Sequence, residues 1–207
     1  MLQIIFATGN EGKMREIRAI LEDLEVGISS MKEAGLDLEI EENGTTFEDN
    51  AVIKARTVAN ALAAQGKEQT CVVMADDSGL EIDCLNGEPG VYSARYLGEE
   101  TPFDLKSRDI LRRMADVPED ERTARFVCAI AAIFPDGEAV TTSGIVEGRI
   151  GYELRGDNGF GYDPIFYLPE YGRTAAELSD EEKNRISHRS RALGLMKEEL
   201  KKRISLL

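Results

Sequence analysis

The feature that most constrains the fold is an apolar run that leads through a turn into a helix at the start of the chain. Leu2–Ala7 has the length and composition of a buried strand. The turn Thr8-Gly9-Asn10-Glu11-Gly12-Lys13 follows it. Beyond the turn, apolar residues recur at helical spacing, namely Met14, Ile17, Leu21 and Leu24. This order predicts an α/β domain.

The remaining patterns extend that expectation to a mixed sheet. Val26–Met31 is a plausible second strand, and Thr46 begins a helix with Asp49 as its capping-box partner. Two strand-like runs, Arg125–Phe134 and Glu138–Gly148, flank a turn and predict a long antiparallel hairpin. We therefore expect a mixed central β-sheet flanked by helices, with two lobes around a substrate cleft, in one domain spanning residues 1–207.

Helices are also expected in the second half of the chain. Thr101-Pro102 is a helix start with proline at the first helical position. The chain from Thr174 to its end is helical in pattern, and Ser187 is a candidate cap for the last segment.

An acidic sequence follows one of the short apolar runs. Cys71–Ala75 is strand-like and leads into Asp76-Asp77-Ser78-Gly79, which we interpret as a loop that presents carboxylates. A further short strand is expected over Leu80–Leu85.

Composition limits the partners and the compartment. A net charge of −14 argues against an extended nucleic-acid surface, although it allows a phosphorylated small molecule held with a cation. The longest apolar stretch, Phe126–Phe134, falls short of the roughly 20 residues of a spanning helix, and we expect neither a membrane partner nor a signal peptide. Three cysteines, an odd number, fit free thiols in a cytoplasmic protein.

Two segments have the composition of a phosphate and metal site. Glycines and a helix N-terminus in Thr8–Lys13 suit phosphate oxygens, although an ordinary strand-to-helix turn reads the same way. The spacing is not that of a Walker A loop, since Met14 follows the lysine. The pairs Glu41-Glu42 and Asp76-Asp77 offer the hard oxygen ligands that Mg²⁺ prefers, and their alternative is solvated acidic loops.

Two later segments suit recognition of a base. Asn158–Pro164 holds two glycines around Phe160, a loop that either exposes the ring for stacking or buries its aromatics. Lys183–Arg191 is basic and contains His188, the one histidine of the chain. Arg189 could pair with a purine edge, but a solvated helix end is the ordinary interpretation.

Together these segments resemble the inosine-triphosphate pyrophosphatase family, which includes the bacterial XTP/dITP diphosphatases. The resemblance spans nearly the whole chain. It rests on six motifs in order, which are Ala7-Thr8-Gly9-Asn10 with Gly12-Lys13, Thr46-Phe47 with Asn50-Ala51 and Lys54-Ala55-Arg56, Ala75–Leu80, Pro89–Tyr96, Gly159–Pro164 and Ile186–Arg189.

The resemblance implies a role for each matching residue. The triphosphate would be held by Thr8, Gly9, Asn10, Glu11, Gly12 and Lys13. Glu41 and Asp77 would bind Mg²⁺, with Asp77 as general base, Lys13 as the second catalytic group, and Ser78 in contact with substrate. The nucleoside end would be formed by Phe160, Gly161, Tyr162, Asp163, Lys183, His188 and Arg189.

The implied activity is cleavage of ITP, dITP and XTP between the α- and β-phosphates, by a Mg²⁺-dependent homodimer. One rival is the related group of septum-associated pyrophosphatases that act on dTTP and UTP, which the Ile186–Arg189 segment argues against. Another is a protein that binds triphosphates without hydrolysing them, which the intact Asp76-Asp77 and Lys13 argue against.

Overall fold

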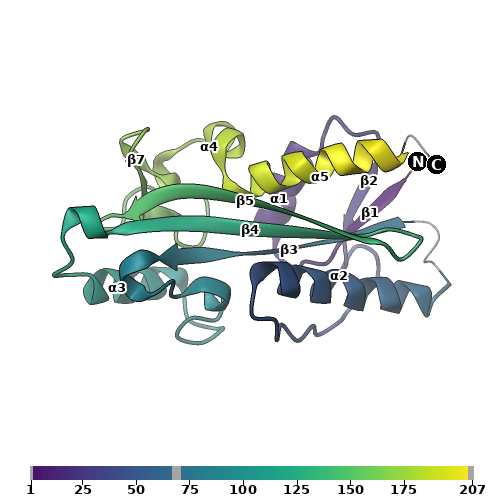
Figure 1. The fold of residues 1–207 in the computed structure, drawn as a ribbon, viewed down its shortest axis with the longest axis horizontal. Coiled ribbons are helices and arrows are strands. Elements are labelled where there is room, and N and C mark those ends of the chain that lie inside the picture. The colour runs from purple at the N-terminus through teal and green to yellow at the C-terminus, as the bar shows by residue number, and fades with distance from the viewer. Residues whose placement is uncertain (1, 67–70, 205–207) are drawn as a thin grey trace. The chain divides into compact units, whose positions relative to one another are not determined.

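The computed structural model describes residues 2–66 and 71–204. Within this part of the chain, strands and helices follow one another in α/β order, as predicted (Figure 1). The strands are β1 (Gln3–Phe6), β2 (Gly27–Ser30), β3 (Cys71–Ile82), β4 (Thr123–Ile133), β5 (Ala139–Ile150), β6 (Phe166–Leu168) and β7 (Arg173–Thr174). The helices are α1 (Glu11–Ile20), α2 (Phe47–Ala63), α3 (Phe103–Arg113), α4 (Asp180–Ile186) and α5 (His188–Ile204).

The described strands form one mixed sheet in the order β2-β1-β3-β4-β5-β6-β7. β1 pairs in parallel with β2 and β3, whereas β6 pairs antiparallel with β5 and β7. The predicted hairpin is present as β4 and β5, which are neighbours in the sheet. The prediction of a mixed sheet flanked by helices is confirmed.

The expected loop at Asp76–Gly79 is wrong. These residues lie inside β3, which runs unbroken for 12 residues, so the expected strands on either side are one strand. Sequence patterns favoured a loop because two adjacent carboxylates rarely lie in a buried strand. Here both are buried, and each has cationic partners on its own side of the strand.

The chain divides into two compact units. The first comprises Met1–Asp77, Cys128–Gly144 and Arg189–Leu207, and the second comprises Ser78–Val127 and Ile145–His188. Three strands contribute residues to both units, namely β3, β4 and β5. The expectations of a single folding domain and of a substrate cleft stay predictions.

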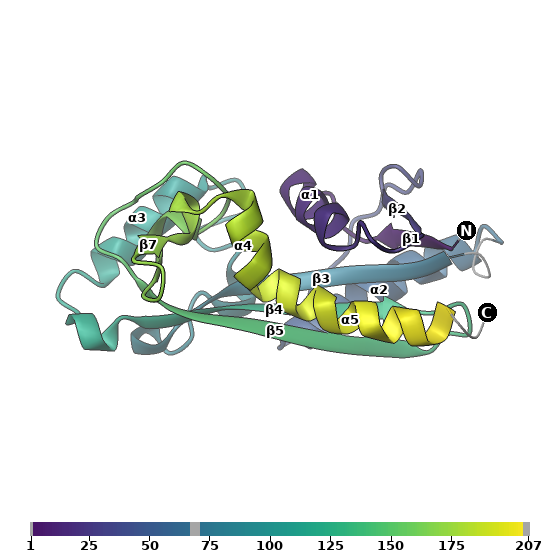
Figure 2. The ribbon, with the colours of Figure 1, turned by 90° about the horizontal axis from the view of Figure 1, so that it is seen from above.

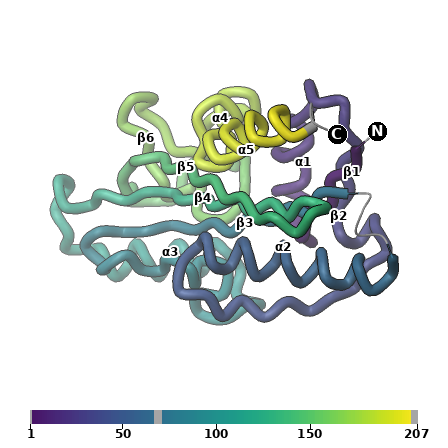
Figure 3. Tube along the Cα trace, turned by 45° about the vertical axis from the view of Figure 1, so that its right-hand side comes forward, coloured from purple at the N-terminus to yellow at the C-terminus, as the bar shows by residue number. Residues whose placement is uncertain are grey.

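In the first unit, helices cover both faces of the sheet. α1 and α5 lie on one face and α2 lies on the other (Figures 1 and 3). The apolar core on the α1 and α5 side joins these two helices to β1, β3 and β4 through residues such as Phe6, Ile17, Met74, Ile130 and Met196. Fully buried large side chains at these positions each contribute roughly 1.5–3 kcal/mol to folding.

The register of β1 places the first turn beside the acidic pair. Phe6 lies opposite Met74, and the Ala7 amide donates to the Met74 carbonyl at 2.7 Å. The turn that follows β1 therefore begins beside the Asp76 and Asp77 segment of β3. Parallel strands commonly bring functional groups to one edge in this way.

The second unit has its own core. The end of β3, α3 and the start of β4 contribute to it, together with the segment that runs from β5 through α4 (Figure 2). Its fully buried members include Leu80, Ile82, Ile110 and Phe166. A separate core in each unit explains why the chain divides at these positions.

The helix starts follow the predicted chemistry with two exceptions. Asn10 caps α1, and Thr46 caps α2 by accepting from the Asp49 amide at 3.1 Å. The Asp49 carboxylate, however, accepts from Thr45 Oγ1 rather than completing a capping box. Pro102 precedes the first residue of α3 and so occupies the cap instead of the first helical position.

The last part of the chain is helical from α4 onward, but not from Thr174. Thr174 ends the short strand β7, and Ser187 separates α4 from α5. The last three residues of the predicted helical segment lie outside the described part of the chain. Cys71, Cys84 and Cys128 are free thiols, as expected. No helix among the described residues has the length and apolar character needed to cross a membrane.

Candidate active site

The turn between β1 and α1 is organised by its own polar side chains. The Asn10 amide donates to Thr8 Oγ1 at 3.1 Å, and the Lys13 amide donates to Asn10 Oδ1 at 3.0 Å. Gly9 is exposed, and no described atom lies within 4 Å of the place where a Cβ would stand. The turn therefore presents an open backbone at a helix N-terminus, an arrangement that suits an anion.

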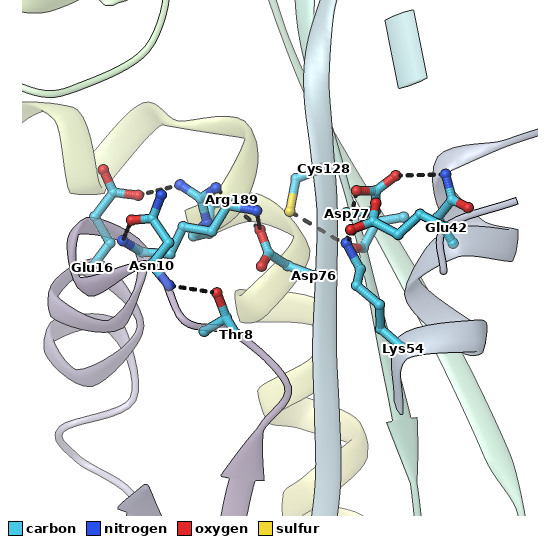
Figure 4. Close-up of polar contacts among 12 residues, drawn as sticks. Thr8, Asn10, Glu16, Glu42, Lys54, Asp76, Asp77, Cys128 and Arg189 are labelled. Atoms are coloured by element: carbon cyan, nitrogen blue, oxygen red, sulfur yellow. Dashed lines mark hydrogen bonds and ion pairs between the residues drawn. The ribbon is translucent and has the colours of Figure 1, made fainter. Parts of the chain in front are cut away.

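Asp76 is the centre of a buried ion network on the α1 and α5 side of β3 (Figure 4). Its Oδ2 lies 2.9 Å from Lys13 Nζ and 3.1 Å from Arg189 Nη2. Arg189 also pairs with Glu16 of α1. Burial alone would raise the pKa of Asp76, but Lys13, Arg189 and Lys54 outweigh it and hold that pKa well below its ordinary value. Asp76 is therefore ionised at neutral pH and joins α1, α5 and β3.

Asp77 points to the opposite side of β3, as the next residue of a strand must. It lies against α2, where Lys54 Nζ approaches its Oδ1 at 2.9 Å and Asn50 Nδ2 donates to its Oδ2 at 3.2 Å. Burial raises the pKa of Asp77, with the Glu42 charge acting in the same direction and Lys54 acting against it. Asp77 is thus the carboxylate of the pair whose proton affinity is shifted toward the working range of a general base.

Lys54 connects Asp77 to a second carboxylate. Its Nζ lies 3.3 Å from Glu42 Oε2, so one ammonium group serves two acidic side chains. Burial lowers the pKa of Lys54, but Asp77, Asp76 and Glu42 more than compensate, and the pKa is raised. The predicted metal ligand Glu41 is exposed, whereas its neighbour Glu42 is half-buried and belongs to this cluster.

Asn50 and Lys54 were not assigned a role from the sequence. Both are buried, and they stand four residues apart on the face of α2 that also buries Ala51 and Ala55. A polar residue within an apolar stripe at i, i+4 spacing is the signal that was available, because buried lysine is rare without a partner.

No group of three or more potential metal-ligating side chains is found among the described residues. Mg²⁺ does not require one, since one or two carboxylates completed by water and phosphate oxygens suffice. Glu42 and Asp77, brought together by Lys54, meet that requirement.

Cys128 lies in the same unit, where burial raises the pKa of its thiol to about 12 and keeps it protonated.

In the second unit, Asp163 organises the glycine-rich loop. Its Oδ2 accepts the Phe160 amide at 2.8 Å and the Lys183 ammonium at 2.7 Å. The loop depends on glycine at position 159, where φ is +80° and a Cβ would stand 2.2 Å from the same Asp163 oxygen. Lys183 Nζ also lies 4.6 Å from the centre of the half-buried Phe160 ring. Asp163 therefore fixes an aromatic ring and a cation beside each other.

Tyr162 and His188, two more predicted nucleoside-binding residues of this unit, are buried, whereas Gly161 is half-buried. Tyr162 donates its hydroxyl to the Ser93 carbonyl at 2.8 Å and is 3% exposed, so it packs in the core. His188 stacks on Phe126 with ring centres 5.0 Å apart. Ser78 is half-buried on β3. The segment Lys183–Arg191 was expected, as the ordinary interpretation, to be a solvated basic helix end. That expectation is wrong for the three residues proposed to bind the nucleoside, because Lys183, His188 and Arg189 are all buried.

The predicted residues thus gather into two groups. Thr8–Lys13, Asp77 and Arg189 lie in the first unit with Asp76, Lys54 and Glu42. Phe160–Asp163, Lys183, His188 and Ser78 lie in the second. Each group combines a cation with a buried carboxylate, and the second adds an aromatic ring.

Comparisons with known proteins agree along nearly the whole chain. A family model described as the Ham1 family matches residues 4–199. A dITP/XTP pyrophosphatase of Clostridium perfringens is 46% identical over 201 residues, covering 97% of this chain and 98% of that protein. A dITP/XTP pyrophosphatase of Bacillus subtilis is 47% identical over 193 residues, covering 93% and 94%.

Solved structures agree as well. A HAM1 protein from Coxiella burnetii is 40% identical with a TM-score of 0.86, covering 98% of this chain and 100% of that chain. The Staphylococcus aureus Ham1 protein is 40% identical with a TM-score of 0.84, covering 97% and 99%.

Proposed function

Because the chain belongs to the Ham1 family, we propose that it hydrolyses the non-standard purine nucleoside triphosphates dITP, XTP and ITP to monophosphate and pyrophosphate. The relatives named dITP/XTP pyrophosphatase match more than nine-tenths of its length. The structural observation that carries the proposal is the Asp77–Lys54–Glu42 cluster, in which Asp77 and Lys54 are buried. Asp77 lies on β3 beside the open Thr8–Lys13 turn, and all of these residues belong to the first unit.

The turn supplies the phosphate end of the site. Its backbone amides and the α1 N-terminus attract phosphate oxygens, and Gly9 leaves room for them. Lys13 would add a full positive charge that stabilises the departing pyrophosphate. Because Asp76 holds Lys13 at 2.9 Å, that ammonium group is positioned before substrate arrives.

Magnesium fits the first unit's carboxylates, and we propose Glu42 with Asp77 as its ligands in preference to the exposed Glu41. When bound, Mg²⁺ neutralises phosphate charge and makes a bound water more acidic. Asp77 accepts a proton from the attacking water at a carboxylate oxygen. The water oxygen bonds to the α-phosphorus while the bond to the bridging oxygen breaks and pyrophosphate departs.

The second unit supplies recognition of the base. Inosine and xanthosine carry a 6-oxo acceptor where adenosine carries an amino donor. Donors such as Lys183 and His188 would be left unpaired against ATP, at a cost of about 1–3 kcal/mol each. Phe160 would stack on the base, because Asp163 holds its backbone and Lys183 lies over its ring.

Arg189 was also predicted to read the purine edge. Its guanidinium donates to Glu16 and Asp76 in a buried network, so Arg189→Ala would leave a buried carboxylate short of a partner. A change in the ITP to ATP ratio in that variant is therefore informative only when its stability is measured alongside. Lys183 is likewise held by a buried carboxylate, Asp163, so the stability of a Lys183 variant has to be measured alongside its ratio of ITP to ATP hydrolysis as well.

The decisive assay incubates the chain with Mg²⁺ and, separately, ITP, dITP, XTP, GTP, ATP and dTTP. Pyrophosphate released mainly from the first three, and abolished by EDTA, is the expected result. Orthophosphate as the first product would refute cleavage between the α- and β-phosphates. Pyrophosphate from dTTP alone would refute the purine selectivity, and no product from any substrate would leave a binding protein.

The remaining family expectations are part of the same proposal. The chain would act in the cytoplasm, on a small-molecule substrate, as a homodimer. Light scattering coupled to size exclusion should then give twice the chain mass of 22.9 kDa. A single unfolding transition seen by both far-UV dichroism and tyrosine fluorescence would support one cooperative domain over residues 1–207.

A further inference from the structure

The second unit contains a cavity that the proposed reaction does not use. It has a volume of about 250 Å³, and its lining includes Glu119, Arg122, Arg149, Tyr152, Arg155 and Tyr167. None of these residues belongs to the groups assigned above to phosphate, metal or base. Three arginines against two glutamates, Glu119 and Glu153, give the lining a formal charge of +1 in a chain whose net charge is −14.

The wall of this cavity holds a buried positive charge with no carboxylate partner. Arg122 is 1% exposed, and its guanidinium donates to the carbonyls of Met114, Val117, Ile150 and Gly151. Its flat face lies 4.3 Å from the centre of the Tyr152 ring. Within the described residues it forms no ion pair. A buried charge balanced only by carbonyl dipoles and a ring face is a place where an anion gains electrostatic energy.

Two further arginines line the cavity, and each is paired with an exposed carboxylate that an anionic ligand can replace. Arg149 Nη1 lies 3.4 Å from Glu119 Oε1, and Arg155 Nη2 lies 2.7 Å from Glu153 Oε1. Both carboxylates are more than 60% exposed. Exposed pairs of this kind contribute only about 0–1 kcal/mol. A phosphate group, which binds guanidinium in a bidentate manner, can therefore replace a glutamate at little loss.

The ring of Tyr152 offers the second half of a ligand site. Its side chain is 64% exposed although one face is held against Arg122. A ring fixed by a cation on one side and open on the other is preorganised for stacking. The cavity is smaller than the roughly 300–1,000 Å³ of drug-sized pockets, which favours a ligand smaller than a nucleoside triphosphate.

We propose that this cavity binds a phosphate monoester with an aromatic body. Its phosphate would contact Arg149 and Arg155 in the field of Arg122, and its body would lie on Tyr152. A nucleoside monophosphate has both parts. The site is a second binding site, independent of whether the chain hydrolyses triphosphates.

The chain contains no tryptophan, so Tyr152→Trp creates a single reporter at the cavity. We would titrate this variant with inosine 5′-monophosphate and, as a comparison, with uncharged inosine. A saturable change in tryptophan emission is expected with the monophosphate, and the affinity for inosine should be at least about tenfold weaker. The affinity for the monophosphate should fall by the same factor when Arg149→Gln and Arg155→Gln are added. Arg18→Gln, which removes an exposed arginine paired with Glu33 in the first unit, is the matched control and should change nothing.

A second measurement keeps Tyr152 intact. Calorimetric titration of the unaltered chain with inosine 5′-monophosphate should show one more binding site than the chain carrying Arg149→Gln and Arg155→Gln. Monophosphate bound at the proposed active site is common to both proteins and cancels in this comparison. Equal stoichiometry in the two proteins, or an emission change that survives loss of both arginines, would overturn the proposal. Pyrophosphatase activity is not a readout in either experiment, so the two proposals fail separately.

Discussion

Replacing Lys54 with methionine tests the Asp77–Lys54–Glu42 cluster most directly. Lys54 Nζ lies 2.9 Å from Asp77 Oδ1 and 3.3 Å from Glu42 Oε2, and the side chains of Lys54 and Asp77 are 9% and 8% exposed. Methionine keeps most of the volume and removes the charge. Removing one partner of a buried ion pair costs about 3–5 kcal/mol. Glu42, at 29% exposed, can turn toward water, so we expect the lower end of that range at neutral pH.

The same change should move the titration of Asp77. Burial already raises the pKa of Asp77, and Lys54 is the largest influence opposing it. An opposite charge within about 4–6 Å lowers a carboxyl pKa by about 1–3 units, so its removal should raise the pKa of Asp77 by that amount. A base with a raised pKa stays protonated to higher pH. The acidic limb of the kcat/KM profile should therefore shift toward alkaline pH by about 1–3 units.

The assay is pyrophosphate release from ITP between pH 5 and pH 9, with urea unfolding in EDTA at the same pH values. The stability lost in the variant should shrink as pH falls through the raised pKa of Asp77, because protonated Asp77 is neutral. Lys197→Met is the control, since Lys197 pairs with the exposed Asp23 and should shift neither curve. An acidic limb that does not move in Lys54→Met would refute the assignment of Asp77 as the titrating base held by Lys54.

Three further predictions follow from the same geometry. Asp77→Asn should abolish turnover while changing ITP affinity far less, and near-normal turnover would remove Asp77 from the chemistry. Lys183→Met should narrow the ratio of ITP to ATP hydrolysis by about five- to 150-fold, the equivalent of about 1–3 kcal/mol for one unpaired donor, and an unchanged ratio would place base recognition elsewhere. The fold holds the pKa of Asp76 below its ordinary value of 3.8, so Asp76 contributes stability that is complete above about pH 4 and lost as pH falls further. Asp76→Asn should therefore be less stable at pH 7, and urea unfolding from pH 7 to pH 3 should show a weaker acid dependence than in the parent chain.

Sequence patterns were sufficient for the order of elements because the signals there are local. The β1–α1 turn, the Thr46 cap and the β4–β5 hairpin each depend on residues within a few positions of one another. The continuity of β3 was not accessible in the same way. Whether Asp76 and Asp77 end a strand or continue it depends on Lys13, Lys54 and Arg189, which reach them from distant parts of the chain.

The sequence indicates which residues belong to the candidate site, but it does not indicate which side chains pair with one another. The family motifs contain Asp77, His188 and Arg189, but no pattern indicates that Arg189 is buried on Asp76 and Glu16. Likewise, the crowding of acidic residues near position 41 leaves the choice of ligand open in sequence. The contact between Lys54 and Glu42 is what distinguishes Glu42 from its neighbour.

The opposite orientation of Asp76 and Asp77 also limits how β3 can change length. Because side chains alternate along a strand, inserting or deleting one residue between Cys71 and Asp76 would turn every following side chain to the other face. The carboxylate held by Lys13 and Arg189 would then meet α2, and the one held by Lys54 would meet α1 and α5. Point substitutions in this segment change one side chain at a time, but a one-residue insertion or deletion would exchange the positions of the ion-paired Asp76 and of Asp77, the proposed base. Insertions or deletions in this part of β3 should therefore be tolerated only when they change its length by two residues.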